Sequence, residues 1–251
     1  HFELALQLME STDPSEAQQR WRLKALSGLG KLCFAMGKVP EAERYLRGAV
    51  TVGRQMALNP QDMAVLYHWL GETLFWQDQY EERLHIGEEG LALLGDDTKS
   101  LGAALMNQTV AFALLLLGKP DRAQELTRQT ASFIEELPYT EELGIAYDHI
   151  IRGHLGKKGD MKSAQYWIDA LEEQARPHSD LIGIYHVQDF TGALMKRTGD
   201  LREAISQASL SLETAERCGD LKYQSWALSH LALGHLIAGN IQEAARFSER
   251  A

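Results

Sequence analysis

The feature that most constrains this sequence is a turn residue that recurs every 40 or 41 positions. The six residues of this series are Gly37, Asp78, Gly118, Gly159, Gly199 and Gly239. A small residue usually stands five positions after each turn, and another stands seven positions before it. Arg83 breaks the first rule and Arg152 breaks the second. A fixed internal period of this length is typical of a helical repeat protein.

Each part of the repeat has a physical reason in a pair of antiparallel helices. Glycine suits a helix end because it adopts the left-handed backbone conformation without a clash at Cβ. Small residues on facing helices allow the two helix axes to approach closely. The spacing therefore predicts an all-α fold of about six helix-turn-helix repeats, at about residues 22–57, 63–94, 101–136, 141–175, 181–217 and 222–251.

Stacking on a neighbour is required for such a short unit, because one pair of helices buries too little apolar surface to offset its conformational entropy. The sequence therefore predicts a single continuous solenoid over residues 1–251. Residues 1–20 are predicted to be the tail of a preceding repeat, which suggests an excerpt from a longer array.

Composition and charge exclude several other classes of protein. Hydrophobic residues make up 45% of the chain and charged residues 24%, as in ordinary soluble domains. The formal net charge of −10 repels phosphate backbones, so nucleic acid is not an expected partner. The longest apolar run, residues 110–118, is about half of the roughly 20 residues that a membrane helix needs. Cys33 and Cys218 show no metal-ligand spacing and suit reduced thiols, which favours the cytoplasm.

The turn glycine, the small residues around it and the large apolar residues such as Leu26, Leu29, Leu228 and Leu231 resemble the tetratricopeptide repeat (TPR) family. The units are longer than that family's usual length of about 34 residues. Long units of this kind resemble the helical repeat regions of large bacterial signalling ATPases, transcription activators and nucleotide cyclases. The resemblance implies a right-handed α-α superhelix whose first helices line a concave groove.

Groove residues can be placed on the first helices by their distance from the turn. Ten positions before each turn residue the chain carries a polar side chain: Ser27, His68, Gln108, His149, Asp189 and Ser229. About one helical turn along the same face lie Lys24, Lys31, Phe34, Glu72, Phe75, Phe112, His186, Lys196 and Trp226. We expect the polar series to face a solvated groove, with an ordinary exposed helix face as the alternative. For the phenylalanines, packing between repeats is the alternative.

No catalytic or metal-binding arrangement can be assembled from the sequence. His149 and His154 are five positions apart, which is not the i, i+4 spacing that binds zinc. A clamp for a C-terminal carboxylate, as in chaperone-binding members of the family, would need the basic pattern of Lys24 and Lys31 to continue. Val65 and Glu72 follow instead. The sequence therefore predicts neither an enzyme nor a cofactor or metal.

These observations favour a non-catalytic scaffold or sensor segment of a larger cytoplasmic signalling or regulatory protein. Its expected partner is a protein, a peptide or a small-molecule effector held along the groove, without contact to nucleic acid or membrane. The alternative is a structural spacer or oligomerisation module that self-associates end to end through its uncapped ends.

Overall fold

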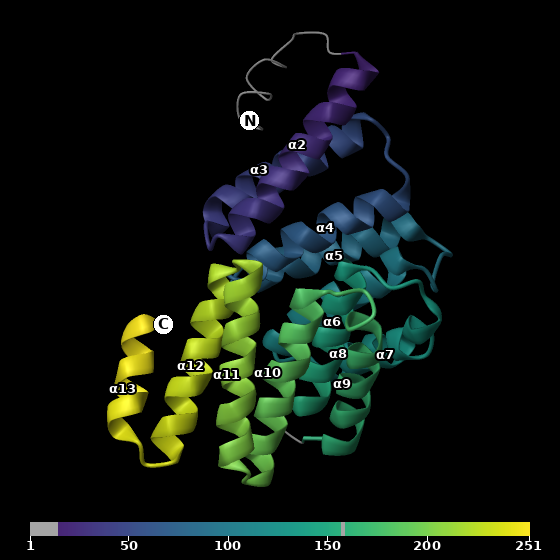
Figure 1. Ribbon diagram of the computed structural model, residues 1–251. Helices are drawn as coiled ribbons and strands as arrows, with labels where there is room; N and C mark the ends of the chain where they lie inside the picture. Colours follow the sequence, from purple (N-terminus) through teal and green to yellow (C-terminus); the bar gives the residue numbers. More distant parts are fainter. Residues whose placement is uncertain (1–14, 157–158) are drawn as a thin grey trace. The chain divides into compact units, whose positions relative to one another are not determined.

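The computed structural model describes residues 15–156 and 159–251 (Figure 1). In these ranges the chain forms twelve α-helices and one short 3-10 turn, and no strand. The helices are α2 (Glu16–Ala35), α3 (Val39–Gln55), α4 (Pro60–Phe75), α5 (Tyr80–Leu94), α6 (Leu101–Leu116), α7 (Pro120–Ala131), α8 (Glu141–Leu155), α9 (Met161–Ala175), α10 (Leu181–Thr198), α11 (Leu201–Cys218), α12 (Leu221–Ile237) and α13 (Ile241–Arg250), with the 3-10 turn η1 (Ile134–Glu136) after α7. The predicted all-α fold of six helix pairs is confirmed.

The chain divides into two compact units at the bond between Leu137 and Pro138. Unit 1 contains the pairs α2–α3, α4–α5 and α6–α7, and unit 2 contains α8–α9, α10–α11 and α12–α13. In both units each helix packs against the next one along the chain, as Figure 1 shows for α10 to α13. A continuous solenoid over residues 1–251 stays a prediction.

The turn residues take the backbone conformation that the repeat predicts. All five glycines of the series have a positive φ, between 46° for Gly159 and 91° for Gly199. Asp78, the one residue of the series with a side chain, also has a positive φ, of 58°. Each ends the first helix of its pair, so the periodic residues act as helix stops.

The small residues before the turns lie where two helices approach closely. A Cβ atom added to Gly30 would lie 2.6 Å from Leu46 Cγ, and one added to Gly192 would lie 3.3 Å from the carbonyl oxygen of Ala204. The alanines after the turns are buried. Glycine and alanine therefore recur because a larger side chain would push the paired helices apart.

Two predicted boundaries were wrong. Residues 16–20, predicted to belong to a preceding repeat, form the first turn of α2, because Ser15 and Gln18 make a capping box there. The remaining part of that predicted tail, residues 1–14, lies outside the described residues. The second helix predicted to reach residue 136 ends at Ala131, and Leu137 is extended, as the residue before a proline prefers.

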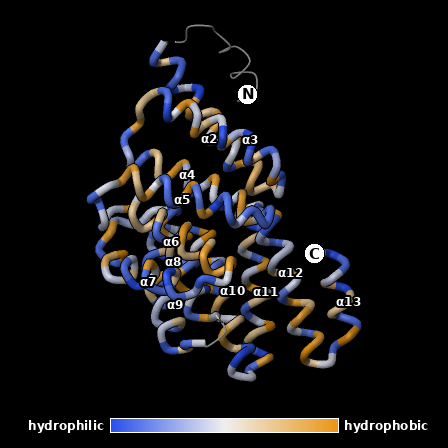
Figure 2. Tube along the Cα trace, turned by 180° about the vertical axis from the view of Figure 1, so that it is seen from behind, coloured by the Kyte–Doolittle hydropathy of each residue, from blue (hydrophilic) through white to orange (hydrophobic). Residues whose placement is uncertain are grey.

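Apolar residues gather between the helices of each unit. In unit 2 a core cluster around Tyr185, Leu212 and Leu231 joins α10, α11 and α12. Figure 2 shows further hydrophobic segments on the α12–α13 hairpin, and several of its apolar side chains are exposed: Leu233, Leu236, Ile237 and Ile241. Within residues 15–156 and 159–251, no helix is both long enough and apolar enough to cross a bilayer.

Candidate functional site

The polar series predicted to face a solvated groove is buried at its four central positions. His68, Gln108, His149 and Asp189 are each at most 4% exposed, so the prediction of solvent contact is wrong for them. Of the neighbouring predicted positions, the buried ones are Phe34, Glu72, Phe112 and His186. The partly exposed ones are Ser27, Lys31, Phe75, Lys196 and Trp226. Lys24 and Ser229 are exposed.

The physical reason for this burial is the stacking of the pairs. Helix α4 packs against helices on both sides within unit 1, and α10 packs against α8, α9 and α11 within unit 2. A first helix with neighbours on both sides keeps little of its surface in solvent. Ser27 on α2 and Ser229 on α12 belong to the first and last of the first helices, and they retain some exposure.

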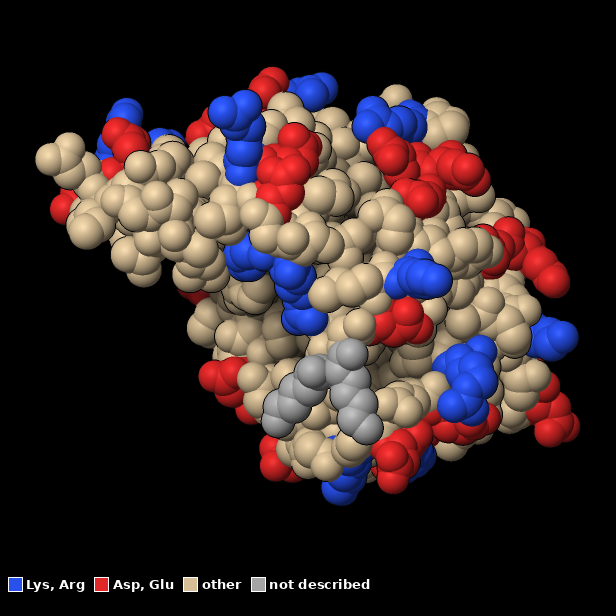
Figure 3. Space-filling view, turned by 90° about the horizontal axis from the view of Figure 1, so that it is seen from below, with Lys and Arg blue, Asp and Glu red and all other residues tan. Residues whose placement is uncertain are grey.

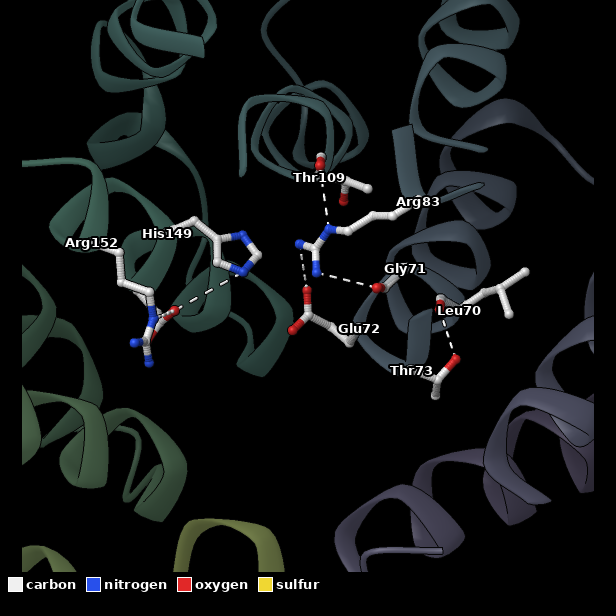
Figure 4. Close-up of polar contacts among 9 residues, drawn as sticks. Leu70, Gly71, Glu72, Thr73, Arg83, Thr109, His149 and Arg152 are labelled. Carbon is white, nitrogen blue, oxygen red and sulfur yellow. Dashed lines mark hydrogen bonds and ion pairs between the residues drawn. The ribbon is translucent and has the colours of Figure 1, made fainter. Parts of the chain in front are cut away.

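In unit 1 the predicted residues Glu72, Phe75 and Phe112 meet around Arg83. Figure 4 shows the contacts of Arg83 with Glu72, Gly71 and Thr109. Arg83 Nη2 donates to Glu72 Oε1 at 2.9 Å, and the carbonyl oxygens of Gly71 and Thr109 accept from Nη1 and Nε at 3.2 and 3.4 Å. The guanidinium carbon lies 5.5 and 5.3 Å from the centres of the Phe75 and Phe112 rings.

Arg83 has no solvent exposure, and its contacts join α4, α5 and α6. Glu72 therefore neutralises a buried arginine. Phe112 packs between repeats, which was the alternative to a groove position for the phenylalanines. Phe34 packs in a similar way, with its ring edge-on to Trp69 at 6.1 Å. This cluster is a structural element of unit 1.

Unit 2 contains a second polar cluster, which we call the unit-2 network: Asp148, Arg152, His186, Asp189 and His230. Asp148 on α8 accepts from Arg152 Nε at 2.8 Å and from Nη2 at 3.0 Å. The Nδ1 atom of His186 on α10 lies 2.9 Å from Asp148 Oδ1. The Nδ1 atom of His230 on α12 lies 2.6 Å from Asp189 Oδ1. Charged and polar side chains therefore connect the first helices of three successive repeats.

The carboxylate of Asp189 determines which nitrogen of the His230 imidazole carries the proton. An ionised carboxylate only accepts hydrogen bonds, so Nδ1 of His230 must donate to Asp189 Oδ1. In the neutral imidazole, Nε2 is then the acceptor. Asp189 thus orients His230 and assigns its tautomer by geometry. The contact of His186 Nδ1 with Asp148 is an ion-pair distance without hydrogen-bond geometry, so it assigns no tautomer.

Burial and charge act in opposite directions on Asp148. Burial favours its neutral form, but Arg152 and His186 outweigh burial and hold the pKa of Asp148 well below its usual range. Burial opposes the charge of Arg152 in the same way, and Asp148 outweighs it, so the pKa of Arg152 is raised. The pair is therefore fully ionised at neutral pH.

One end of the unit-2 network reaches the surface. The side chains of Arg152 and His230 are each 26% exposed, and Trp226 on α12 is partly exposed beside them. The Arg152 guanidinium lies 5.5 Å from the Trp226 ring centre and 4.9 Å from that of Phe190. The centre of the His230 imidazole lies 5.6 Å from the centre of the Trp226 ring. An arginine, a tryptophan and a histidine thus form one partly exposed cluster.

The nearest cavity in unit 2 is small. It has a volume of about 10 Å³ and is lined by Asp189 and His230 together with Lys196, Gly192 and Gly234. A space of this size holds about one water molecule. A larger open groove of about 830 Å³ lies in unit 1 beside Trp21 and Lys24. In the parts of the chain that the structure describes, no group of three or more His, Cys, Asp or Glu residues could hold a metal ion.

Sequence reasoning found His186, Asp189 and Trp226 but missed Asp148, Arg152 and His230. Two signals were available. Asp148, Asp189 and His230 are 41 positions apart, whereas the predicted series used the neighbouring positions His149 and Ser229. The second signal was Arg152 itself, which stands where the repeat expects a small residue.

Charged side chains elsewhere on the surface are mixed in sign. Figure 3 shows acidic and basic residues interspersed over the face it presents. Many are paired within or between helices, as Arg54 is with Glu89 and Arg122 with Glu88. The unit-2 network differs from these pairs because its carboxylates are buried and its neighbour Trp226 is partly exposed.

No protein-family model matches the chain, and a search of curated proteins gives no match. Among the solved structures that are similar to the chain are three with 16% identity each. BtubC (BKLC) from P. vanneervenii has a TM-score of 0.41, with 99% of this chain and 84% of that chain covered. The nearly identical TPR-like repeats of a Podosopora anserina protein assigned as a kinesin light chain give 0.41, with 91% and 92% covered.

The third structure is a signal transduction ATPase with numerous domains and a tetratricopeptide repeat sensor, from Pyrococcus horikoshii, with a TM-score of 0.48. The similarity covers 94% of this chain and 40% of that one. The second and third of these structures contain TPR-like repeats, the type of repeat that the sequence resembles. The fold assignment itself rests on the six helix pairs of this chain.

Proposed function

We propose that this chain is a non-catalytic binding module, and that it holds a protein or peptide partner on the first helices of unit 2. The observation that carries the proposal is the partly exposed cluster of Arg152, Trp226 and His230. Arginine and tryptophan are the residues most enriched among binding hot spots. The chain would serve as a scaffold or sensor segment of a larger cytoplasmic signalling or regulatory protein.

The cluster is already held in one arrangement before a partner arrives. Asp148 fixes Arg152 through two hydrogen bonds, and Asp189 fixes His230 through one. A side chain that is fixed in advance loses little conformational entropy when it binds. The buried carboxylates of Asp148 and Asp189 therefore support binding indirectly, because they hold Arg152 and His230 in position for a partner.

An enzymatic role is the competing interpretation, since a hydrogen-bonded Asp–His pair such as Asp189 and His230 also occurs in the triads of hydrolytic enzymes. Such a triad also needs a hydroxyl or thiol bonded to the other imidazole nitrogen. Within the described ranges no hydroxyl or thiol makes that bond, and the adjacent Ser229 donates instead to the carbonyl oxygen of Ser225. This supports the assignment of the Asp189–His230 pair to binding.

The proposal can be tested with peptides selected on the full chain from a random displayed library. We expect Trp226→Leu and His230→Leu to weaken their binding by about tenfold or more, which corresponds to about 1.4 kcal/mol. His178→Leu is the matched control, because His178 is an exposed histidine of the same unit. Selected peptides that bind all three variants as tightly as the original chain would overturn the proposal.

A second candidate function is a spacer or oligomerisation module. The exposed apolar residues of the α12–α13 hairpin favour it, since exposed apolar patches commonly mark interaction sites. This function would use the hairpin and would leave the cluster of Arg152, Trp226 and His230 without a role in assembly.

A further inference from the structure

We infer that the cluster of Arg152, Trp226 and His230 binds a neutral amide group, with His230 Nε2 accepting from the amide N–H and Arg152 donating to the amide carbonyl. This inference rests on the proposed binding function and names the chemistry that the site would recognise. The amide is either a peptide group of the partner's backbone or the side chain of an asparagine or glutamine.

His230 supplies the acceptor. Its Nδ1 donates to Asp189 Oδ1 at 2.6 Å, which leaves the lone pair on Nε2 in the neutral ring. The ring is partly exposed, and none of the hydrogen bonds among the described residues involves its Nε2. A ligand N–H can therefore reach a hydrogen-bond acceptor whose direction Asp189 has fixed.

Arg152 supplies the donor. Asp148 occupies its Nε and Nη2 atoms, and in the described ranges no hydrogen bond involves Nη1. The guanidinium carbon also lies 4.9 Å from the Phe190 ring centre and 5.5 Å from that of Trp226, so these rings together with Asp148 limit its movement. The side chain is 26% exposed, and Nη1 is the donor atom that we assign to the ligand carbonyl.

Trp226 joins the two polar groups. Both the guanidinium of Arg152 and the imidazole of His230 lie within 6 Å of its ring centre. A flat amide could lie on this partly exposed ring while its carbonyl and its N–H face the donor and the acceptor. An amide is the common biological group that offers both at neighbouring atoms.

Charge favours an amide over an ion at this place. The unit-2 network contains two carboxylates and one guanidinium, so with neutral histidines its formal charge is −1. A ligand carboxylate would be repelled by the His230 lone pair and by the nearby buried charges of Asp148 and Asp189, which oppose its attraction to Arg152. A ligand ammonium would meet the exposed guanidinium of Arg152. A neutral amide avoids both repulsions.

The test uses small probes and the NMR signals of the full chain. The probes are N-acetylglycine N-methylamide for a backbone amide and propionamide for a side-chain amide, with propionate and propylammonium as charged controls of matched size. The signals are the indole N–H of Trp226, identified by its loss in Trp226→Phe, and the ring nitrogens of ¹⁵N-labelled His230. Probes are added to about 100 mM, well above the millimolar Kd that is weak binding for a small ligand.

We expect one or both amides to shift the Trp226 and His230 signals, and the charged probes to shift them at least about fivefold less. His230→Leu should abolish the response of Trp226, His230→Gln should retain part of it through the side-chain carbonyl, and His178→Leu should leave it unchanged. Before any probe is added, the ¹⁵N shifts of His230 should show the Nδ1–H tautomer.

The contrary results are equally specific. A stronger response to propionate or propylammonium, an unchanged response in His230→Leu, the Nε2–H tautomer, or no response to either amide would each overturn the inference. The proposed binding function fails separately, if selected peptides bind regardless of Trp226 and His230. Peptides that need these residues, together with probes that show no preference for amides, would retain the function and reject the amide chemistry.

Discussion

Two arginines occupy positions that the repeat reserves for small residues, and each is the centre of a polar cluster. Arg83 replaces the alanine after a turn, and Arg152 replaces the glycine or alanine before one. A large cation at a helix contact needs a carboxylate and aromatic neighbours to offset its desolvation. Glu72 and Asp148 are those carboxylates.

Arg83→Ala restores the residue type of the repeat, yet we expect it to destabilise unit 1. The change leaves Glu72 buried without its guanidinium partner and opens a cavity between Phe75 and Phe112, which should cost about 3–5 kcal/mol. Urea unfolding measures the loss. Arg122→Ala is the control, because the Arg122–Glu88 pair is exposed and should contribute at most about 1 kcal/mol. Equal losses in the two variants would contradict a special role for the buried pair.

Asp148 predicts a specific dependence of stability on pH. Its pKa is lower in the folded protein than in the unfolded chain, so its contribution is fully present above the unfolded value of about 3.9. It is lost as the pH falls from there toward the folded pKa, at no more than about 1.4 kcal/mol per pH unit.

We therefore expect the difference in unfolding free energy between the original chain and Asp148→Asn to shrink as the pH falls below about 4. Denaturant unfolding at a series of pH values measures it. Asp169→Asn, at an exposed carboxylate of α9, provides the comparison. A difference between the two unfolding free energies that grows below pH 4 would show that the direction assigned to Asp148 is wrong.

At the scale of the helix, the sequence predicted best the positions where a positive φ strongly favours glycine. The six turn residues all have a positive φ, as their spacing predicted. Two helix ends did not follow the period, one of them set by a capping side chain. Ser15 began α2 earlier than predicted, and α7 ends at Ala131, five residues before the predicted end at 136.

The turns provide a clean test of backbone strain. Gly199 has a φ of 91°, and a Cβ atom added there would meet no described atom within 4 Å. Gly199→Ala should therefore cost about 1–2 kcal/mol through the left-handed backbone alone. Asp78→Gly should have the opposite effect, a gain of up to about 1 kcal/mol, reduced by the loss of the hydrogen bond from Tyr80 to Asp78. Thermal unfolding of both variants measures this, and a neutral Gly199→Ala would contradict the argument.

At the scale of the molecule, the period appears directly in contacts between repeats. Within unit 1 the Gln61 side chain accepts from the backbone N–H of Gly102, and within unit 2 Tyr139 donates to Asp180. Both pairs are 41 positions apart, as are Asp189 and His230. The sequence therefore predicted which repeats are neighbours, but not which face of a first helix meets the next. A register error of one residue turns a helix by about 100°, which separates His149 from Asp148 and Ser229 from His230.

The exposed apolar residues of the α12–α13 hairpin lead to the last prediction. Ile241 is 70% exposed, and Leu233, Leu236 and Ile237 are exposed on the preceding helix. Stacked helix pairs bury such residues against a neighbour, so we expect this hairpin to self-associate as the protein concentration rises. Light scattering should show a mass that increases with concentration, and the double variant Leu236→Lys, Ile241→Lys should remain at the mass of one chain. Leu93→Lys and Leu210→Lys, at exposed leucines outside the hairpin, are the controls and should assemble like the original chain. If the hairpin variant assembles as strongly as they do, contact through α12 and α13 is not how the chain associates.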